Sequence, residues 1–106
     1  MPKYLYNGSY TLEGVRGLLK EGGSSRRAQV ENTVKGMGGK LEVFYFAFGG
    51  NDVYSIMEFP DNVSCAAVSL AVNAGGGFKG NATLLLSPEE MDQATKKKVL
   101  YRGPGQ

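Results

Sequence analysis

Three tyrosines, an asparagine and an aspartate carry most of the side-chain chemistry that the expected strands of this sequence offer. Phenol, amide and carboxylate groups in an otherwise apolar cavity would suit the binding of a small apolar or aromatic molecule. They would also suit a cofactor-independent reaction on such a molecule, in which an aspartate made more basic by its surroundings would serve as the base. The candidate ligand-binding residues are Tyr6, Asn7, Tyr45, Asp52 and Tyr54.

Three other groups of residues invite a chemical interpretation. Arg26 and Arg27 are candidates for anion binding, although basic residues near a helix start more often form a solvated face. Asp52 and Glu58 face the same side of an expected strand, but the strand separates them by roughly 20 Å, which excludes an acid-base pair within one subunit. The glycine-rich segment 75–80 lacks the spacing of a phosphate-binding loop and reads as a flexible connection between a helix and a strand.

Composition narrows the possible functions. The chain has no histidine and a single cysteine, Cys65, so zinc hydrolases, Ser-His-Asp or Cys-His enzymes and intrachain disulfides are excluded. A formal net charge of +2 is too small to indicate nucleic acid or an anionic membrane as a partner. No apolar stretch of signal-peptide length opens the sequence, so we expect a cytoplasmic protein, and we expect it to use no metal or cofactor.

Apolar periodicity and the positions of glycine, proline and capping residues predict an α+β chain in the order βαββαβα. We expect strands at 3–10, 40–48, 52–59 and 78–86, and helices at 12–37, 62–74 and 88–97. Gly22 and Gly23 should break or kink the first helix, with Ser24 capping its second part. The first six elements correspond to the ferredoxin-like βαββαβ sandwich, a four-stranded antiparallel sheet in the order 4-1-3-2 with both helices on one face.

The segment 40–48 is apolar on both sides. Strict alternation predicts one row of Leu41, Val43, Tyr45 and Ala47 and a second row of Glu42, Phe44, Phe46 and Phe48. Helices can cover only one face of the sheet, so the other row should be buried by a second copy of the chain or line a ligand cavity. Phe44, Phe46 and Phe48 are therefore candidate interface residues of a homodimer, with a trimer or a higher oligomer as the alternative.

The connection after this strand contains Gly49-Gly50, which predicts a two-residue type I′ hairpin turn with positive φ at both glycines. Asp52 would then order the turn through its carboxylate, or else point into a cavity at the edge of the sheet.

The chain reads as a single domain, 1–106, with a core at about 2–87 and a C-terminal helix and tail at 88–106. Small residues give the helix at 62–74 a packing face made of Val63, Ala66, Ala67, Leu70 and Ala74. The tail contains Val99, Leu100 and Tyr101, which are too apolar for a disordered end, so we expect them to dock on the body or on a neighbouring subunit.

The sequence resembles the GYD family of small bacterial proteins from Pro2 to Met91. The matching features are the Met-Pro-Lys-Tyr start, Gly38-Gly39-Lys40, Phe44-Tyr45-Phe46, Gly49-Gly50-Asn51-Asp52, Phe59-Pro60-Asp61 and Ser87-Pro88-Glu89-Glu90. The resemblance implies a ferredoxin-like fold of the dimeric α/β-barrel type and leaves the biochemical role open. Asn51 stands where the tyrosine of the family's Gly-Tyr-Asp motif would be, so any chemistry of that tyrosine is absent here.

These observations favour a non-catalytic assembly or small-ligand-binding module that forms a homo-oligomer. The alternative is a cofactor-independent enzyme of the dimeric α/β-barrel kind that acts on a small apolar or aromatic substrate. An RNA-recognition motif uses a similar order of elements, but the segment 52–59 lacks the basic, glycine-rich start of that motif. Native mass spectrometry of the purified protein would report the oligomer mass and any retained ligand together.

Overall fold

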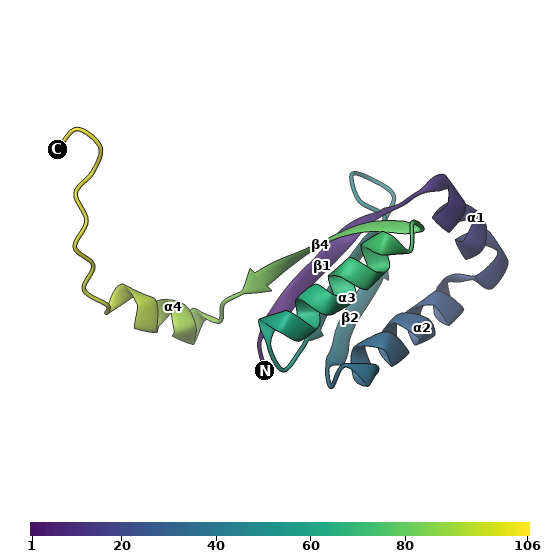
Figure 1. Cartoon of the computed structure of the whole chain (residues 1–106), viewed down its shortest axis with the longest axis horizontal. Helices are drawn as coiled ribbons and strands as arrows, with labels where there is room; N and C mark the ends of the chain where they lie inside the picture. The colour runs from purple at the N-terminus through teal and green to yellow at the C-terminus, as the bar shows by residue number, and fades with distance from the viewer.

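The computed structural model describes all 106 residues and contains four strands and four helices. The strands are β1 (Lys3–Tyr10), β2 (Lys40–Phe46), β3 (Val53–Glu58) and β4 (Phe78–Leu85), and the helices are α1 (Leu12–Glu21), α2 (Gly23–Gly36), α3 (Asn62–Ala74) and α4 (Pro88–Thr95). All strand pairs are antiparallel and the sheet has the order β2-β3-β1-β4 (Figure 1). The predicted four-stranded antiparallel sheet is confirmed. No helix has the length and the run of apolar residues needed to cross a membrane.

Short-range capping explains where the helices begin. Thr11 caps α1 by accepting from the Gly14 N–H at 3.2 Å, and Asp61 caps α3 by accepting from the Ser64 N–H at 2.8 Å. Ser87 opens α4 with a complete capping box. The predicted break at Gly22 is confirmed, because Gly22 takes a φ of +86° and ψ of 163° between α1 and α2, a conformation that belongs to glycine. The predicted cap by Ser24 is wrong, since α2 begins at Gly23 without a side-chain cap.

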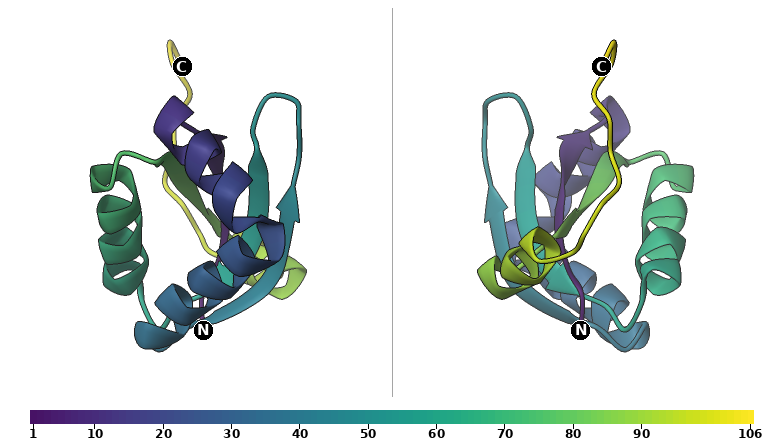
Figure 2. Two further views of the ribbon diagram at one scale, coloured as in Figure 1. Left: turned by 90° about the vertical axis from the view of Figure 1, so that its right-hand side faces the viewer. Right: turned by 90° about the vertical axis from the view of Figure 1, so that its left-hand side faces the viewer.

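The core lies between the sheet and the helices. Tyr4 and Tyr6 of β1 and Met57 of β3 pack against Val34 of α2 and against Cys65 and Val68 of α3. Both α2 and α3 therefore lie on the same side of the sheet (Figure 2). The opposite face of the sheet carries no helix and is called here the uncovered face. Strand alternation and register place Leu5, Asn7, Val43, Tyr45, Tyr54, Ile56, Asn81 and Thr83 on it, with the charged residues Lys3, Lys40, Glu58 and Lys79 toward its ends.

A register shift in β2 changes which of its side chains share a face. Leu41 pairs with Met57 and Val43 pairs with Ile56, so the ladder is irregular around Glu42. An extra residue in one strand reverses the alternation beyond it. The predicted row of Leu41 with Val43 and Tyr45 is therefore wrong, because Leu41 packs on the core side together with Phe44, whereas Val43 and Tyr45 lie on the uncovered face.

The predicted type I′ turn at Gly49-Gly50 is also wrong, because neither glycine has a positive φ. β2 ends at Phe46 and β3 begins at Val53, two residues earlier and one residue later than expected. The Ala47 N–H donates to the Asp52 carbonyl at 2.8 Å, which leaves a four-residue loop. Loops of that length are usually built around turns with negative φ, so they need no glycine at a left-handed position.

The structure bears on two packing predictions made from apolar side chains, and the first is wrong. The predicted packing face of α3 is its exposed face: Leu70, for example, is 73% exposed, and Cys65, Val68 and Val72 turn toward the sheet instead. The second placed the C-terminal residues on the body or on a neighbouring subunit; they do not dock on the body of the same chain, and docking on a neighbouring subunit stays a prediction. Leu100 is 104% exposed, and α4 and the tail project beyond the end of β4 (Figure 1).

Candidate functional site

The two helices that cover the sheet lie over its opposite edges. α2 packs on β2 and α3 packs on β4, and these are the two outer strands. The gap between these helices therefore lies over the central strands β1 and β3, and it contains a cavity of about 340 Å³. This volume is at the lower end of the range for small-molecule sites, roughly 300–1,000 Å³.

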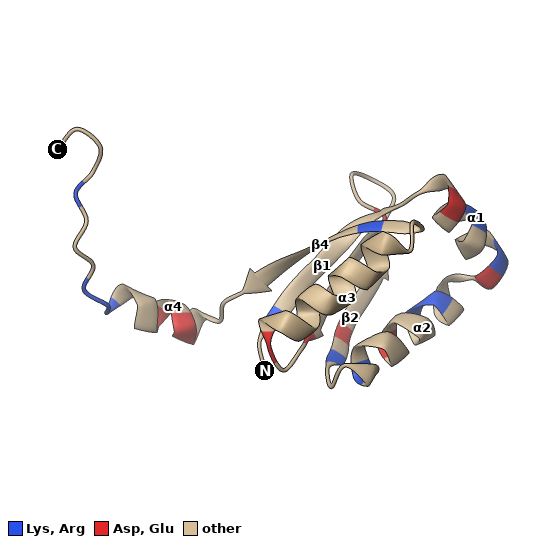
Figure 3. Cartoon of the chain, in the orientation of Figure 1, with Lys and Arg blue, Asp and Glu red and all other residues tan.

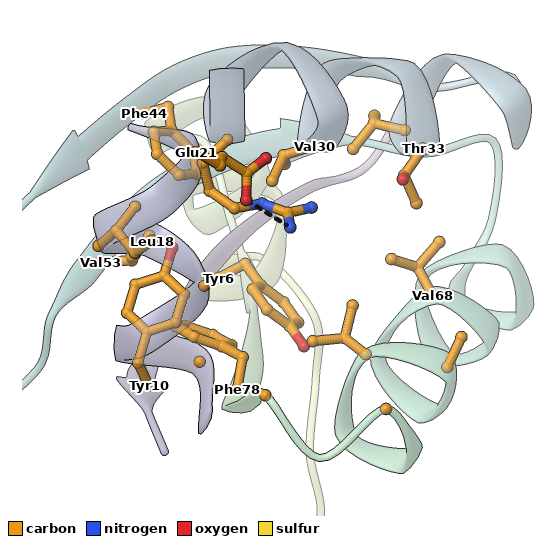
Figure 4. A pocket seen from close by; sticks show the side chains of 18 of the residues that line it. Tyr6, Tyr10, Leu18, Glu21, Val30, Thr33, Phe44, Val53, Val68 and Phe78 are labelled. Carbon is orange, nitrogen blue, oxygen red and sulfur yellow. Dashed lines mark ion pairs between the residues drawn. The ribbon is translucent and has the colours of Figure 1, made fainter. Parts of the chain in front are cut away.

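The cavity has mainly apolar walls contributed by the sheet and by α1, α2 and α3 (Figure 4). β1 and β3 form the floor with Tyr6, Val53 and Met57. The walls include Leu18 of α1, Val30 and Val34 of α2, Phe44 of β2, Val68 and Val72 of α3 and Phe78 of β4. Twelve of the 19 lining residues are hydrophobic, so the cavity favours an apolar occupant.

The ring of Tyr6 forms part of the floor of this cavity, and its hydroxyl lies beside Gly80 of β4. Its side chain is 6% exposed, and its hydroxyl makes no hydrogen bond within the protein. Burial raises the pKa of this phenol, and the nearby Ser69 hydroxyl opposes that rise without reaching hydrogen-bonding geometry. Figure 4 shows the Tyr6 ring in the middle of the cavity lining, between Phe78 and Val68. The hydroxyl itself is covered by Gly80, so it is the ring of Tyr6 that a molecule in the cavity would contact.

An ion pair lies on the helical side of the cavity, across the break between α1 and α2. Glu21 is the last residue of α1, and its carboxylate lies 3.6 Å from the Arg26 guanidinium of α2 (Figure 4). The ring of Tyr10 also lines the cavity, and burial raises the pKa of its hydroxyl, with the Arg26 charge acting in the opposite direction. Arg26 therefore reaches the cavity already paired with an acid.

The glycine-rich segment before β4 holds α1 in place. The Thr11 hydroxyl donates to the Gly76 carbonyl at 2.8 Å, and the Thr11 N–H donates to the Gly77 carbonyl at 3.1 Å. A Cβ on Gly14 would lie 1.9 Å from the Gly77 carbonyl oxygen, so the two backbones can meet only because Gly14 has no side chain. This contact brings α1 over the cavity, where Leu18 takes part in the lining.

The structure divides the five candidate ligand-binding residues among three places. Tyr6 lies in the cavity, whereas Tyr45, Tyr54 and Asn7 form one row on the uncovered face, where Tyr54 pairs with the other two in register. Asp52 lies at the hairpin loop, where its carboxylate accepts from the Tyr10 N–H at 2.9 Å and its own N–H donates to the Gly8 carbonyl at 2.8 Å. Asp52 thus ties the loop to β1.

The other candidates are also separated. Arg26 lines the cavity, and Arg27 is an exposed residue of α2. Phe44 and Phe46 are in edge-to-face contact at 5.2 Å on the helix side of the sheet, and Phe48 is fully exposed in the loop. The interface and anion-binding roles of these residues stay predictions. No cluster of three or more acidic or cysteine side chains is arranged to hold a metal ion.

Several cavity residues were missed by reasoning from sequence, most clearly Tyr10, Val30, Val68 and Phe78. The alternation of β1 does place Tyr10 on the face of Tyr4 and Tyr6. In the sequence, however, a row of buried aromatic residues and an apolar stripe on a helix indicate ordinary core packing. These residues line a cavity only because α2 and α3 lie apart.

At the loop, the amide of Asn51 donates to the Tyr54 hydroxyl at 3.3 Å. The position at which the sequence departs from the Gly-Tyr-Asp motif thus contacts the uncovered face.

The comparison with known proteins covers nearly the whole of this architecture. The GYD domain profile matches residues 4–95 of 106, from β1 to the end of α4. No curated protein sequence and no solved structure matches the chain. The chain therefore belongs to the GYD domain family.

Proposed function

We propose that the protein is a homo-oligomeric module that binds a small apolar or aromatic ligand in the cavity between the sheet and the helices. The observation that carries this proposal is the cavity of about 340 Å³ itself, because twelve of the 19 residues that line it are hydrophobic. An apolar space of this size between a sheet and its helices suits the burial of a small apolar molecule.

The lining supports a largely apolar ligand. The apolar side chains of the walls would bury most of a small ligand, while the Tyr10 and Thr33 hydroxyls of the lining would fix its orientation. The Glu21–Arg26 pair lies at the same cavity, but the two charges face each other at 3.6 Å. A formally charged ligand would have to break that pair, so a neutral ligand is favoured.

The proposed assembly follows from the uncovered face. The strand order β2-β3-β1-β4 with both long helices on one side supports a ferredoxin-like fold of the dimeric α/β-barrel type. In such an assembly the uncovered face would be buried by a second copy. Tyr45 is 70% exposed and Tyr54 40% exposed on that face, where Val43 and Ile56 lie beside them, and burial of these side chains would supply hydrophobic stabilisation.

The test of the ligand site is the binding of an uncharged apolar fluorophore, N-phenyl-1-naphthylamine, to protein refolded from urea to remove any retained ligand. Val72→Phe should fill part of the cavity and weaken binding about tenfold or more, because Val72 is a half-buried wall residue. Leu70→Phe is the matched control, since it adds a comparable ring on the exposed face of the same helix.

Equal binding to the two variants and the unmodified protein would place the fluorophore elsewhere and contradict the proposed site. Native mass spectrometry of the protein as purified provides the second measurement, because a retained small molecule should be present in the unmodified protein and reduced in Val72→Phe.

The enzyme alternative has no comparable site. Its five residues lie on the floor of the cavity, on the uncovered face and at the loop, and the Asp52 carboxylate already accepts a backbone hydrogen bond. We therefore propose binding, without a catalytic step.

A further inference from the structure

The C-terminal arm, defined as residues 86–102, has apolar side chains and little contact with the body of its own chain. Leu86 is 54% exposed and Met91 50% exposed, and Val99, Leu100 and Tyr101 are each more than three-quarters exposed. The radius of gyration is 17.0 Å, against about 13 Å for a compact domain of this length, because the arm extends the molecule (Figure 1).

The arm nevertheless has a specified local structure. The Ser87 hydroxyl accepts from the Glu90 N–H at 3.0 Å, the Glu90 carboxylate accepts from the Ser87 N–H at 2.9 Å, and Pro88 occupies the first turn. A helix of eight residues is too short to be stable alone in water. The capping box fixes where this helix starts, and the exposed Leu86 and Met91 leave apolar side chains of the arm without cover in the single chain.

The uncovered face of the sheet is the surface that suits the apolar side chains of the arm. The arm of a chain does not reach the uncovered face of that same chain. β4 passes into α4 through only Leu86 and Ser87, and Ser87 is extended, with φ −72° and ψ 159°. A return onto the same sheet would require the chain to reverse within these two residues. The arm instead leaves the sheet at the end of β4, and Figure 3 shows its acidic helix start and basic tail lying beyond the body.

From these observations we infer that two copies of the chain exchange arms, so that α4 and the tail of each copy lie on the uncovered face of the other. This inference rests on the proposed pairing of copies and adds the segment that mediates it. The exchange is reciprocal, as a twofold interface requires, because each chain carries both the arm and the face.

The dimensions allow the exchange. Eight helical residues span about 12 Å, and seven extended residues after them add roughly 23 Å. A four-stranded sheet is about 14 Å wide between its outer strands, with strands of eight residues about 26 Å long. The arm is therefore long enough to cross the partner's sheet. The centre of the uncovered face also offers larger apolar side chains, Tyr45, Tyr54 and Ile56, than the exposed face of α3, where alanines lie between Val63 and Leu70.

Cross-linking between two full-length chains of different mass tests the exchange. One copy carries an affinity tag and Leu100→Cys, and the other carries Tyr54→Cys. The native Cys65 is buried, so it does not compete for a short bis-maleimide. We expect a band at the summed mass of the two chains. In the control experiment the second copy carries Leu70→Cys, on the exposed face of α3, in place of Tyr54→Cys. This pair of chains should give no such band.

The outcomes separate the inference from the pairing on which it rests. A dimer by sedimentation without the Leu100–Tyr54 cross-link, or with a cross-link to position 70, would overturn arm exchange and keep the pairing. A monomer would overturn both. A chain carrying both cysteines that cross-links within itself and migrates as a monomer would show that the arm folds back on its own sheet, and would also overturn the exchange.

A substitution in the arm gives an independent measurement. Leu100→Asp should raise the dimer dissociation constant about tenfold or more, because it would bury a charge in the exchanged contact. Leu19→Asp, at an exposed position of α1, should leave that constant unchanged. Equal dissociation constants for the two variants would overturn the exchange.

Discussion

Replacing Tyr6 by phenylalanine should stabilise the ligand-free protein, although the change removes a polar group from a core side chain and leaves its ring in place. The Tyr6 hydroxyl is buried and makes no hydrogen bond, so folding removes it from water without a replacement partner. Tyr4 is the matched control two residues away on the same strand and face. Its side chain is also buried, but its hydroxyl donates to the Asn62 side chain at 2.5 Å.

The expected magnitudes follow from this difference. An unsatisfied buried donor costs about 1–3 kcal/mol, so Tyr6→Phe should raise the free energy of unfolding by about 1 kcal/mol or more. Tyr4→Phe removes a hydrogen bond and should lower it by about 1 kcal/mol. For a domain of this size, 1 kcal/mol corresponds to a shift of roughly 4–8 °C in the melting temperature, so the two variants should move in opposite directions from the unmodified protein.

Urea unfolding and calorimetry of protein refolded without ligand measure both effects. A loss of stability in Tyr6→Phe as large as that in Tyr4→Phe would refute the reasoning. It would mean that the hydroxyl is already bonded, to Ser69 or to a water.

Phe59→Ala should lower the free energy of unfolding by about 3–5 kcal/mol in urea titrations, because Phe59 is fully buried, whereas Phe48→Ala in the exposed loop should change it by less than about 0.5 kcal/mol. Gly22→Ala should lower the free energy of unfolding by about 1–3 kcal/mol in the same assay, because φ is +86° at this position. Gly17→Ala, inside α1 and with open space around the added Cβ, should be neutral or stabilising. Equal losses of stability in the two variants would contradict the conformation of Gly22. The Ser64 backbone N–H donates to Asp61 and lowers the pKa of its carboxyl group. The stability that this cap contributes should therefore be complete above the ordinary Asp pKa of about 4, and it should be lost as the pH falls through the lower pKa of the folded state. Asp61→Asn should flatten that part of the plot of stability against pH.

The hairpin loop also gives a revised expectation for mutation. Gly50 has no positive φ, and a Cβ at this position would meet no atom within 4 Å, so Gly50→Val should be tolerated within about 0.5 kcal/mol. Asp52→Asn should keep most of the stability, because an amide oxygen can still accept from the Tyr10 N–H at the position of the carboxylate. A large loss in either variant by thermal unfolding would contradict the loop geometry.

The sequence by itself determined the elements and most of their ends. Thr11, Asp61 and Ser87 each bond to a backbone N–H three residues ahead, so the helix starts depend only on local sequence. The break at Gly22 is local for the same kind of reason, because its backbone conformation excludes a side chain. Family resemblance and element order also pointed to the antiparallel sheet.

Tertiary structure decided which faces meet. Alternation groups side chains by face but is reversed by one irregular residue, and the register shift near Glu42 moved Leu41 to the side of Phe44. On α3 two apolar stripes were available, and the buried one contains Cys65 and Val68 because of how that helix lies on the sheet. The cavity around Tyr6 exists because α2 and α3 cover opposite edges of the sheet, and such a separation depends on packing between distant segments.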